Sequence, residues 1–416
     1  MINASIITIG DELLIGQVID TNSAWMAQQL NKAGIPVLRR VAVGDSYDEI
    51  WQALDEESQH APIILITGGL GPTADDITKP LLCKYFNGNM IVDEAALANV
   101  RYIFERVFQR PMLDINLKQA EVPDVCKVIQ NKQGTAPGMW FEKDGVIFVS
   151  MPGVPFEMQG MMQDYVIPEL NKRFQLPYIS HRTLLTAGIG ESYLSEMIHD
   201  FETALPPTIK LAYLPGYGLV RLRLSSSGKN KDLLEKELQQ QFEILQSLVK
   251  EWMVTNEDEP LEKAIGKLLI AKKKTLCTAE SCTGGYIAHL LTSIPGSSAF
   301  YNASIVTYSY QAKEDLLGVD HDVLEEQGAV CEEVVIQMAK GALKRMQTDY
   351  SIAVSGIMGP DGGTTDKPVG TVWVAVGSKE KIVTKKLSFR FDRMRNIQLT
   401  ANNALNILRI FINENG

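Results

Sequence analysis

Residues 63–78 read Ile-Ile-Leu-Ile-Thr-Gly-Gly-Leu-Gly-Pro-Thr-Ala-Asp-Asp-Ile-Thr, and this stretch decides the fold class of the first part of the chain. Its first five residues are apolar or β-branched, which is typical of a strand. Glycines follow at once, and a helical pattern then continues to Lys84. A strand, a glycine loop and a helix in this order predict a parallel α/β layer.

The same alternation extends from the start of the chain to about residue 170. Ser5–Ile9 predicts a first strand, Gly10–Gly16 a polar loop, and Ser23–Ala33 an amphipathic helix. Val146–Val149 predicts another buried strand, which leads into the rigid turn Met151-Pro-Gly-Val-Pro155. We therefore expect an α/β domain over residues 1–172.

Residues 173–255 change character and predict a small α+β module. The module is KH-like, but no G-x-x-G clamp for RNA lies between its elements, so a spacer or dimer-contact role is expected. The predicted strands are Thr183–Thr186, Ile209–Tyr213 and Leu219–Leu224, and the predicted helices are Glu191–Phe201 and Leu233–Val249.

The acidic, proline-containing stretch Asn256–Pro260 is interpreted as a linker, and a second α/β domain is expected over residues 260–416. Its clearest helices are Glu332–Met346 and Arg393–Phe411. Its predicted strands are Thr275–Cys277, Tyr301–Tyr308, Tyr350–Ser355, Thr371–Gly377 and Ile382–Phe389.

The composition is that of a globular protein with several domains. A length of 416 residues predicts two to four compact units, and a content of 45% hydrophobic and 22% charged residues is ordinary for a globular chain. No stretch reaches the ~20 apolar residues of a membrane helix, and a charged leader is absent, so a cytoplasmic protein is expected. Five cysteines without a C-x-x-C pair indicate reduced thiols, and a net charge of −10 disfavours direct nucleic-acid binding.

A candidate nucleophile lies in the segment Thr278-Ala-Glu-Ser-Cys-Thr-Gly-Gly285, between a predicted strand and a predicted helix. Ser281 would lie near the helix N-terminus, where free backbone amides can stabilise an oxyanion. Helix capping is the alternative role for Ser281 and Thr283. Cys282 is a rival nucleophile, because thiols at helix N-termini have lowered pKa values, but no base is evident for it.

Lysine is the candidate base, because none of the five histidines is placed to activate Ser281. The segment Val306-Thr-Tyr-Ser-Tyr-Gln-Ala-Lys313 is expected to turn from a strand into a helix, so that Tyr308 and Lys313 face one cleft. Partial burial would lower the pKa of Lys313 and supply the neutral amine of a Ser-Lys dyad. A plain surface position is the alternative for Lys313.

A second glycine loop, Ser355-Gly-Ile-Met-Gly-Pro-Asp-Gly-Gly363, follows another predicted strand and could bring backbone amides close to a phosphate. A flexible turn is its alternative role. Arg393 could clamp that phosphate, with a surface ion pair as its alternative. The expected substrate-binding residues are Thr283, Gly284, Gly285, Ser355, Gly356, Gly359, Gly362 and Gly363.

These segments, in this order, resemble the C-terminal domain of the CinA family, whose relatives are nicotinamide mononucleotide deamidases. The resemblance implies that the carboxamide of nicotinamide mononucleotide is hydrolysed through an acyl-enzyme on Ser281, with Lys313 as the base. It also implies that Tyr308 supports these two residues and that Arg393 contacts the substrate. It implies no metal or cofactor in this domain. Phe391 stands where the family has glycine, so Arg395 is an alternative to Arg393.

The first glycine loop is a candidate phosphate and metal site. Gly68, Gly69, Gly71 and Thr73 can cradle a phosphate, because their loop exposes backbone amides. A divalent ion bridging to that phosphate could be held by four carboxylates; Asp76 also suits the role of helix N-cap. These expected metal ligands are Asp11, Glu12, Asp75 and Asp76.

With Asp20-Thr-Asn22 and residues 151–155, these motifs resemble the CinA family and the broader MoaB/Mog-like molybdopterin-binding fold, a three-layer domain. The resemblance adds Asn22, Pro152 and Gly153 to the phosphate site. It implies either a metal-dependent (Mg, Mn or Co) ADP-ribose pyrophosphatase giving AMP and ribose 5-phosphate, which we favour, or a degenerate molybdopterin-type binding module.

The leading hypothesis is a homodimeric, bifunctional enzyme of pyridine-nucleotide salvage that acts on nicotinamide mononucleotide and ADP-ribose. The alternative, from another class, is a binding protein linked to competence and DNA damage. In a third hypothesis only the C-terminal domain is active and the first domain serves assembly.

Overall fold

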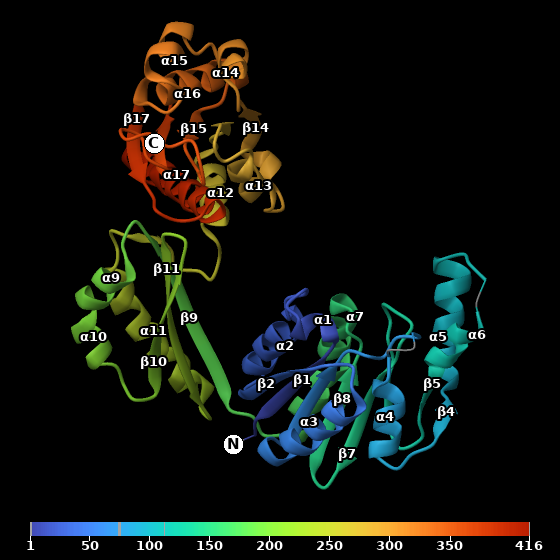
Figure 1. Ribbon diagram of the computed structural model, residues 1–416. Helices are drawn as coiled ribbons and strands as arrows, with labels where there is room; N and C mark the ends of the chain where they lie inside the picture. Colours follow the sequence, from blue (N-terminus) through green and yellow to red (C-terminus); the bar gives the residue numbers. More distant parts are fainter. Residues whose placement is uncertain (1, 74–75, 112, 416) are drawn as a thin grey trace. The chain divides into compact units, whose positions relative to one another are not determined.

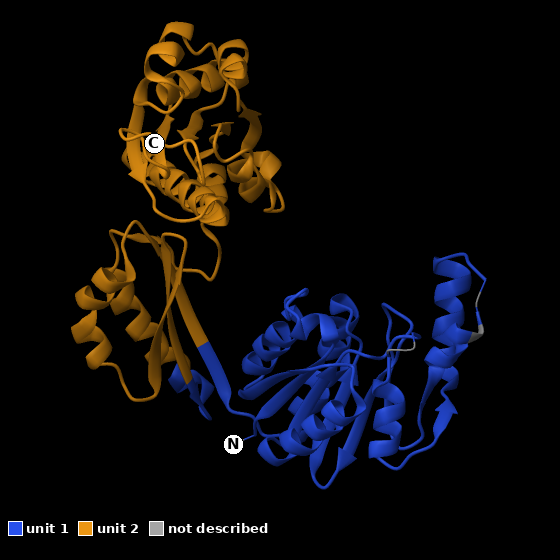
Figure 2. Cartoon of the chain, in the orientation of Figure 1, with its two compact units in different colours: residues 1–180, 227–234 blue, residues 181–226, 235–416 orange. Residues whose placement is uncertain are grey.

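The structure is a computed structural model that describes residues 2–73, 76–111 and 113–415. It divides into two compact units (Figure 2). The first holds residues 1–180 and 227–234, and the second holds residues 181–226 and 235–416.

Unit 1 is built on a six-stranded sheet with the order β2-β1-β3-β8-β7-β6 (Figure 1). The expected parallel layer holds for the first four strands only, since β7 and β8 pair antiparallel. The cause is the two-residue turn Asp144-Gly145, in which both residues have positive φ and which can only join antiparallel neighbours. The strands are β1 (Ala4–Ile9), β2 (Val37–Val43), β3 (Ile63–Thr67), β6 (Lys127–Ile129), β7 (Gly138–Lys143) and β8 (Val146–Met151).

Helices cover both faces of this sheet, because successive strand residues point to opposite sides. Ile6 of β1 packs in one core with Leu30 of α2 (Thr21–Lys32), whereas Ile7 packs in the other with Leu54 of α3 (Tyr47–His60). The domain therefore has three layers, as expected. Its other elements are α1 (Asp11–Leu14), α4 (Thr78–Tyr85), β4 (Met90–Val92), α5 (Glu94–Tyr102), α6 (Asp114–Leu117), β5 (Glu121–Pro123), α7 (Pro155–Met161) and α8 (Ile167–Arg173).

Two local predictions in this unit need correction. The segment Gly10–Gly16 is not wholly a loop, since it contains α1. Helix α2 begins at Thr21 instead of Ser23, because the Asp20 carboxylate accepts a hydrogen bond from the Ser23 amide at 2.9 Å and caps the helix two residues earlier.

The middle module contributes a four-stranded sheet with the order β10-β11-β9-β12. The predicted single helix Glu191–Phe201 is two helices, and β12 was not predicted because three residues carry no recognisable alternation. The elements are β9 (Tyr178–Ala187), α9 (Glu191–Met197), α10 (His199–Thr203), β10 (Ile209–Gly216), β11 (Leu219–Gly228), α11 (Lys231–Leu248) and β12 (Met253–Thr255).

The predicted linker is ordered by charge pairs. The carboxylate of Glu259 is almost fully buried and lies 2.7 Å from Nζ of Lys267, and Thr255 donates to it at 3.2 Å. The stretch after residue 255 is therefore fixed onto α12 (Leu261–Lys272) and does not behave as a free spacer.

The C-terminal domain has a five-stranded sheet with the order β14-β13-β15-β16-β17, in which β14, β13 and β15 are parallel and the last two antiparallel. Its strands are β13 (Leu276–Glu280), β14 (Tyr301–Val306), β15 (Tyr350–Gly356), β16 (Thr371–Gly377) and β17 (Ile382–Ser388). α12, α13 (Tyr286–Thr292) and α17 (Arg393–Asn415) pack on one face, and the other face carries α14 (Tyr310–Leu317), α15 (His321–Gln327) and α16 (Glu332–Met346).

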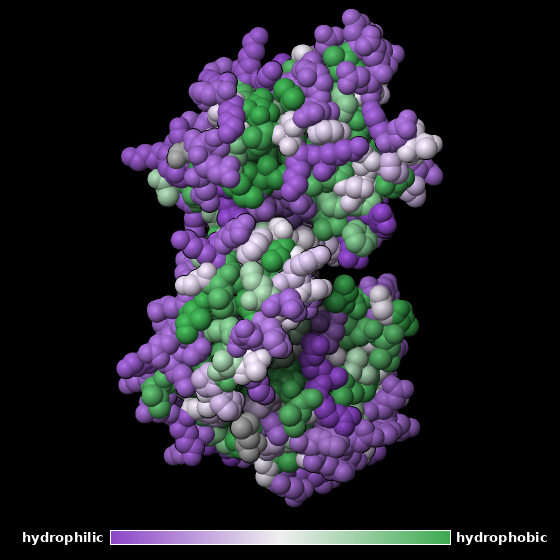
Figure 3. Space-filling view, turned by 90° about the vertical axis from the view of Figure 1, so that its left-hand side faces the viewer, coloured by the Kyte–Doolittle hydropathy of each residue, from purple (hydrophilic) through white to green (hydrophobic). Residues whose placement is uncertain are grey.

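Hydrophilic residues cover most of the face drawn in Figure 3, with apolar residues gathered in patches between them. Among the helices of the described residues, none has the length and apolar character that crossing a bilayer requires.

Candidate active site

Ser281 lies at the carboxyl end of β13, where the parallel neighbours β14 and β15 also end. Its backbone amide donates to the Val354 carbonyl of β15 at 3.0 Å, and the Thr307 amide after β14 donates to the Glu280 carbonyl at 2.9 Å. Chain segments far apart in sequence therefore meet around one hydroxyl. Here they enclose a cavity of about 150 Å³, lined by Ser281, Cys282, Tyr308, Lys313, Ala329, Val330, Ser355, Gly356, Met358 and Arg393.

Lys313 and Ser281 face one another inside this cavity. The Lys313 side chain is 0% exposed, and its Nζ lies 3.0 Å from Ser281 Oγ. The same nitrogen donates to the carbonyl of Thr307 at 2.7 Å and to that of Tyr308 at 3.4 Å. The predicted cleft is thus present, and the surface alternative for Lys313 is wrong.

This environment shifts the Lys313 amine toward its neutral form. Burial lowers the pKa of Lys313 from 10.5 to about 8, because the loss of hydration outweighs the opposing effect of the nearby Cys282 thiol. A neutral amine has two protons and one lone pair. The carbonyls of Thr307 and Tyr308 can accept hydrogen bonds from the two N–H groups, which leaves the lone pair directed at the Ser281 hydroxyl.

Cys282 has the opposite environment. Its side chain is 5% exposed, and burial raises the pKa of the thiol to about 12. The expected lowering by a helix N-terminus is wrong, because desolvation dominates and no base contacts the sulfur among the described residues. The thiolate needed for nucleophilic attack is disfavoured, and the geometry supports Ser281.

Tyr308 and Arg393 form the open rim of the cavity. Tyr308 is 65% exposed and accepts a hydrogen bond from Arg393 Nη2 at 3.1 Å, while Arg393 Nη1 donates to the Gly359 carbonyl at 2.8 Å. Strand β14 ends at Val306, before the predicted Tyr308. Arg395, the alternative cation, stacks on Phe391 and does not line the cavity.

The predicted substrate-binding residues are only partly brought together. Ser355 and Gly356 line the cavity, and Ser355 Oγ donates to the Ala329 carbonyl at 2.7 Å. Gly359 contributes a carbonyl to Arg393 and not an amide to an anion. Gly362 and Gly363 are exposed in the loop and do not line the cavity.

The helix N-terminus beside Ser281 does not offer the free amides that we expected. The amides of Gly285, Ile287 and Ala288 and the hydroxyl of Thr283 all donate to the buried carboxylate of Glu280. The Gly284 amide donates to the Ser281 carbonyl. None of residues 283–285 lines the cavity, so a direct role in substrate binding is not supported by this geometry.

The N-terminal domain has a cavity of about 390 Å³ at the carboxyl ends of β1 and β3. Gly68 and Gly69 have positive φ, and a Cβ on Gly68 would lie 2.2 Å from the Ile9 carbonyl, so glycine is required there. Of the predicted residues, Gly68, Gly69, Gly71, Pro152, Gly153, Glu12 and Asp76 line the cavity; Asp45 and Glu157, which we did not predict, line it too.

Among the described residues, the predicted metal ligands do not converge. The Asp76 carboxylate accepts from the amides of Gly71 and Thr73 at 2.8 and 2.9 Å and from the Thr73 hydroxyl, which makes it a clamp of the glycine loop. Asp11 pairs reciprocally with Asp45 through backbone amides. Asp75 lies outside the described residues, and within those residues no three His, Cys, Asp or Glu side chains could hold one metal ion.

Asn22 lies beside this cavity and reaches the predicted turn at residues 151–155. Its Nδ2 donates to the Gly153 carbonyl at 2.7 Å, and Thr67 Oγ1 donates to the Pro152 carbonyl at 2.8 Å. The Oδ1 atom of Asn22 is buried without a partner, and Asn22 lines a smaller adjoining cavity. This part of the predicted site is assembled.

Sequence profiles of three domains match successive parts of the chain: the probable molybdopterin binding domain at residues 5–172, the KH domain of damage-inducible protein CinA at 181–253, and the CinA C-terminal domain at 258–412. A "CinA-like protein" of Cytophaga hutchinsonii is 48% identical over 98% of this chain and 97% of its own length. The chain belongs to the CinA family. The expected fold class is confirmed, with a MoaB-like first domain and a KH-like module.

Other members have names of the same kind. A "putative competence-damage inducible protein" of Caldicellulosiruptor bescii is 40% identical to this CinA chain over 98% of both. A crystal structure of the competence/damage-inducible protein of Agrobacterium tumefaciens matches with 35% identity and a TM-score of 0.36, covering 38% of this chain and 99% of that one.

The residue that sequence reasoning missed in the CinA C-terminal domain is Glu280. It is fully buried one residue before the nucleophile and accepts six hydrogen bonds. A glutamate at the end of a buried strand, followed by a Thr-Gly-Gly turn and a helix, is the only sequence signal that could have indicated this role.

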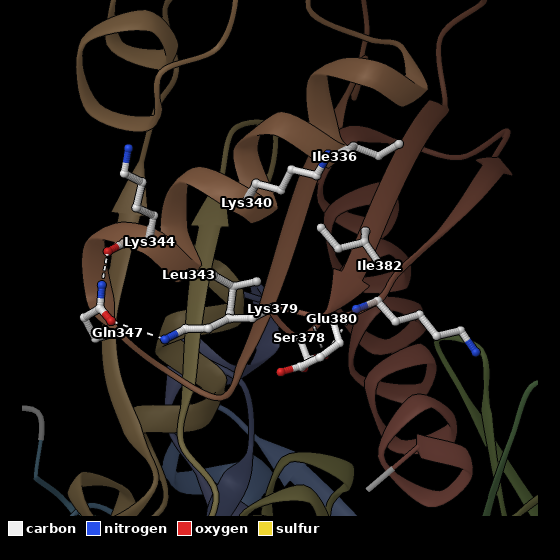
Figure 4. Close-up of a pocket in the computed structure, with 10 residues that line it drawn as sticks. Ile336, Lys340, Leu343, Lys344, Gln347, Ser378, Lys379, Glu380 and Ile382 are labelled. Atoms are coloured by element: carbon white, nitrogen blue, oxygen red, sulfur yellow. Dashed lines mark hydrogen bonds between the residues drawn. The ribbon is translucent and has the colours of Figure 1, made fainter.

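A wider cavity of about 610 Å³ lies between α16 and the β16–β17 turn of this CinA chain (Figure 4). Lysines 340, 344, 379 and 381 surround it, and Lys379 Nζ donates to Gln347 at 3.2 Å. The Ser378 hydroxyl beside this cavity donates to the Glu380 carboxylate at 2.6 Å and accepts from the backbone amides of Glu380 and Lys381. This wider cavity therefore differs from the smaller one, which holds a buried serine–lysine pair.

Proposed function

We propose that the C-terminal domain hydrolyses the carboxamide of nicotinamide mononucleotide to nicotinic acid mononucleotide and ammonia, with Ser281 as nucleophile and Lys313 as general base. The observation that carries the proposal is the 3.0 Å separation of Lys313 Nζ and Ser281 Oγ inside a buried cavity. The family resemblance provides the identity of the substrate.

The reaction follows from these two groups. Ser281 Oγ attacks the carboxamide carbon while its proton passes to the Lys313 lone pair. The resulting ammonium then returns the proton to the amide nitrogen, which leaves as ammonia, and an acyl ester remains on Ser281. Water attacks that ester while Lys313 accepts its proton. Lys313 then gives this proton to Ser281 Oγ as the ester C–O bond breaks, so that nicotinic acid mononucleotide, the free hydroxyl and the neutral amine are formed.

The cavity walls fit a small amide at the end of an anionic substrate. Ala329, Val330 and Met358 provide apolar surface beside Ser281, which suits a planar ring. Arg393 lies at the rim with a charged guanidinium, where it can pair with a phosphate outside the cavity. The Cys282 amide, on the residue after the nucleophile, is the backbone donor that we propose for the oxyanion.

Product analysis tests this proposal. The full chain incubated with nicotinamide mononucleotide should release ammonia and nicotinic acid mononucleotide in a one-to-one ratio. Nicotinamide release instead of ammonia would show cleavage of the glycosidic bond and would contradict an amidase.

For the N-terminal domain we propose hydrolysis of ADP-ribose to AMP and ribose 5-phosphate. Its cavity combines the Gly68–Gly71 loop with the carboxylates of Glu12, Asp45 and Asp76. The amides of Gly68 and Gly71 donate to Met151 and Asp76, so the amides of Gly69 and Leu70 are the ones that we propose for the phosphates. A divalent cation fits only in part, because these carboxylates do not converge; it would need oxygens from the substrate phosphates, as Mg²⁺ sites commonly do. When bound, such an ion would neutralise charge on the pyrophosphate.

The matching prediction is that ADP-ribose gives AMP only when Mg²⁺, Mn²⁺ or Co²⁺ is added. A Gly68→Ala variant should lose this activity, because the added Cβ collides with Ile9, and should keep ammonia release from nicotinamide mononucleotide. Chromatography of both product sets from one preparation provides the measurement. Absence of AMP with all three metals would leave the molybdopterin-type binding module as the better account of this domain.

A further inference from the structure

The Glu280 carboxylate is completely buried and accepts six hydrogen bonds. Its Oε2 accepts from Thr283 Oγ1 at 2.7 Å and from the amides of Gly285 and Ile287 at 3.1 Å each. Its Oε1 accepts from the Ala288 amide at 2.9 Å. These partners belong to the turn after Ser281 and to the first residues of α13, so the carboxylate determines where that turn lies.

The same carboxylate reaches the neighbouring strands. Oε1 lies 3.2 Å from Thr278 Oγ1 of β13 and 3.3 Å from Ser304 Oγ of β14, and Thr278 Oγ1 lies 2.7 Å from the Tyr301 hydroxyl. A continuous set of buried and partly buried hydrogen bonds thus joins the nucleophile turn to β14. Such sets are rigid, because breaking one bond leaves a buried polar atom without a partner.

Strand β14 leads to the base. The Glu280 carbonyl accepts from the Thr307 amide at 2.9 Å, and the Thr307 carbonyl accepts from Lys313 Nζ at 2.7 Å. The Glu280 side chain therefore holds the turn after the nucleophile, and its backbone carbonyl holds Thr307, whose own carbonyl orients the base.

We propose that Glu280 is a positioning residue that sets the distance between the Ser281 hydroxyl and the Lys313 amine. An error of about 1 Å between reacting groups can cost on the order of a hundredfold in rate, so a change at Glu280 acts on the chemistry even though its carboxylate contacts no substrate. The proposal rests on the proposed role of Ser281 and Lys313 but not on the identity of the substrate.

Glu280→Gln tests this with little change of shape. The glutamine oxygen can replace Oε2 and keep the Thr283, Gly285 and Ile287 bonds. The side-chain NH2 group of the glutamine then takes the place of Oε1. It faces the hydroxyls of Thr278 and Ser304, which can accept a hydrogen bond, and the Ala288 amide, which cannot. Thr283→Val is a milder change that removes one donor and is expected to fold. The matched control is Glu259→Gln. Glu259 is another buried glutamate of the same unit, and its carboxylate contacts Thr255 and Lys267, which do not line the cavity.

The primary readout is the rate at which a fluorophosphonate labels Ser281, followed by intact mass, because phosphonylation with loss of fluoride needs an activated hydroxyl but not the natural substrate. We expect Glu280→Gln to label about 10- to 100-fold more slowly, Thr283→Val a few-fold more slowly, and Glu259→Gln at the wild-type rate. With nicotinamide mononucleotide, kcat should fall and KM should stay within about twofold for Glu280→Gln.

The outcomes separate the possibilities. Labelling of a folded Glu280→Gln variant at the wild-type rate, with only a lower melting temperature, would overturn the positioning role and leave a structural one. If Glu280→Gln does not fold, unchanged labelling of Thr283→Val overturns it instead. If wild type releases no ammonia but labelling still slows in the variants, the substrate proposal fails and the positioning role stands.

Discussion

Ser281→Ala should lower ammonia release from nicotinamide mononucleotide by roughly four to six orders of magnitude, because removal of a nucleophile that works with its base as a unit eliminates the covalent pathway. The variant should fold, since Ser281 makes its backbone bond to Val354 through the amide and not the side chain. Steady-state assays with a coupled ammonia readout measure the loss. ADP-ribose hydrolysis in the same sample should be unchanged.

Cys282→Ala distinguishes the two candidate nucleophiles. The buried thiol has its pKa raised to about 12, so almost none of it is ionised at neutral pH. We therefore expect its replacement to cost less than about tenfold, through altered packing of the cavity wall. Loss of activity in Cys282→Ala together with retention in Ser281→Ala would assign the chemistry to the thiol.

Lys313→Met should abolish ammonia release to a similar extent and at the same time stabilise the protein near pH 7. At that pH wild type must bury a largely protonated amine, which costs up to about 3 kcal/mol for a pKa lowered from 10.5 to about 8. Methionine removes this cost but leaves the Thr307 carbonyl without its hydrogen-bond donor. The free energy of unfolding should therefore rise by about 1 to 2 kcal/mol. Thermal and urea unfolding measure it.

The pH dependence of that gain has a defined sign. Between pH 8 and 10.5 the unfolded wild type binds more protons at this lysine than the folded protein, so wild-type stability rises with pH across this window. The advantage of Lys313→Met should therefore shrink over the same window. Lys344→Met, at an exposed lysine on α16, should show neither the gain nor the loss of activity.

Much of the fold could be predicted because most of its long helices and strands have a clear hydrophobic period in the sequence. Ile63–Thr67, Thr371–Gly377 and Glu332–Met346 have the same bounds in the structure as in the prediction. The antiparallel β7 was missed, although Asp144-Gly145 is a typical hairpin turn, because the parallel pattern around it dominated. Strand β12 is too short to show a period.

The candidate site was predicted in its reacting groups and less well in their surroundings. Ser281, Lys313, Tyr308 and Arg393 meet at one cavity, as the family resemblance implied. Thr283 and Gly285 do not reach this cavity, because the Thr283 hydroxyl and the Gly285 amide donate to the Glu280 carboxylate. A sequence does not show which carboxylate becomes buried. In the first domain Asp76 was expected to bind metal, and the structure places its oxygens on backbone amides.

The pH dependence of Ser281 labelling by a fluorophosphonate tests most directly whether a neutral Lys313 activates the hydroxyl. The rate should rise with pH to a plateau, with a midpoint near 8, and should be negligible at every pH in Lys313→Met. A rate that is flat from pH 6 to 10, or a profile that Lys313→Met leaves unchanged, would contradict the Ser-Lys mechanism.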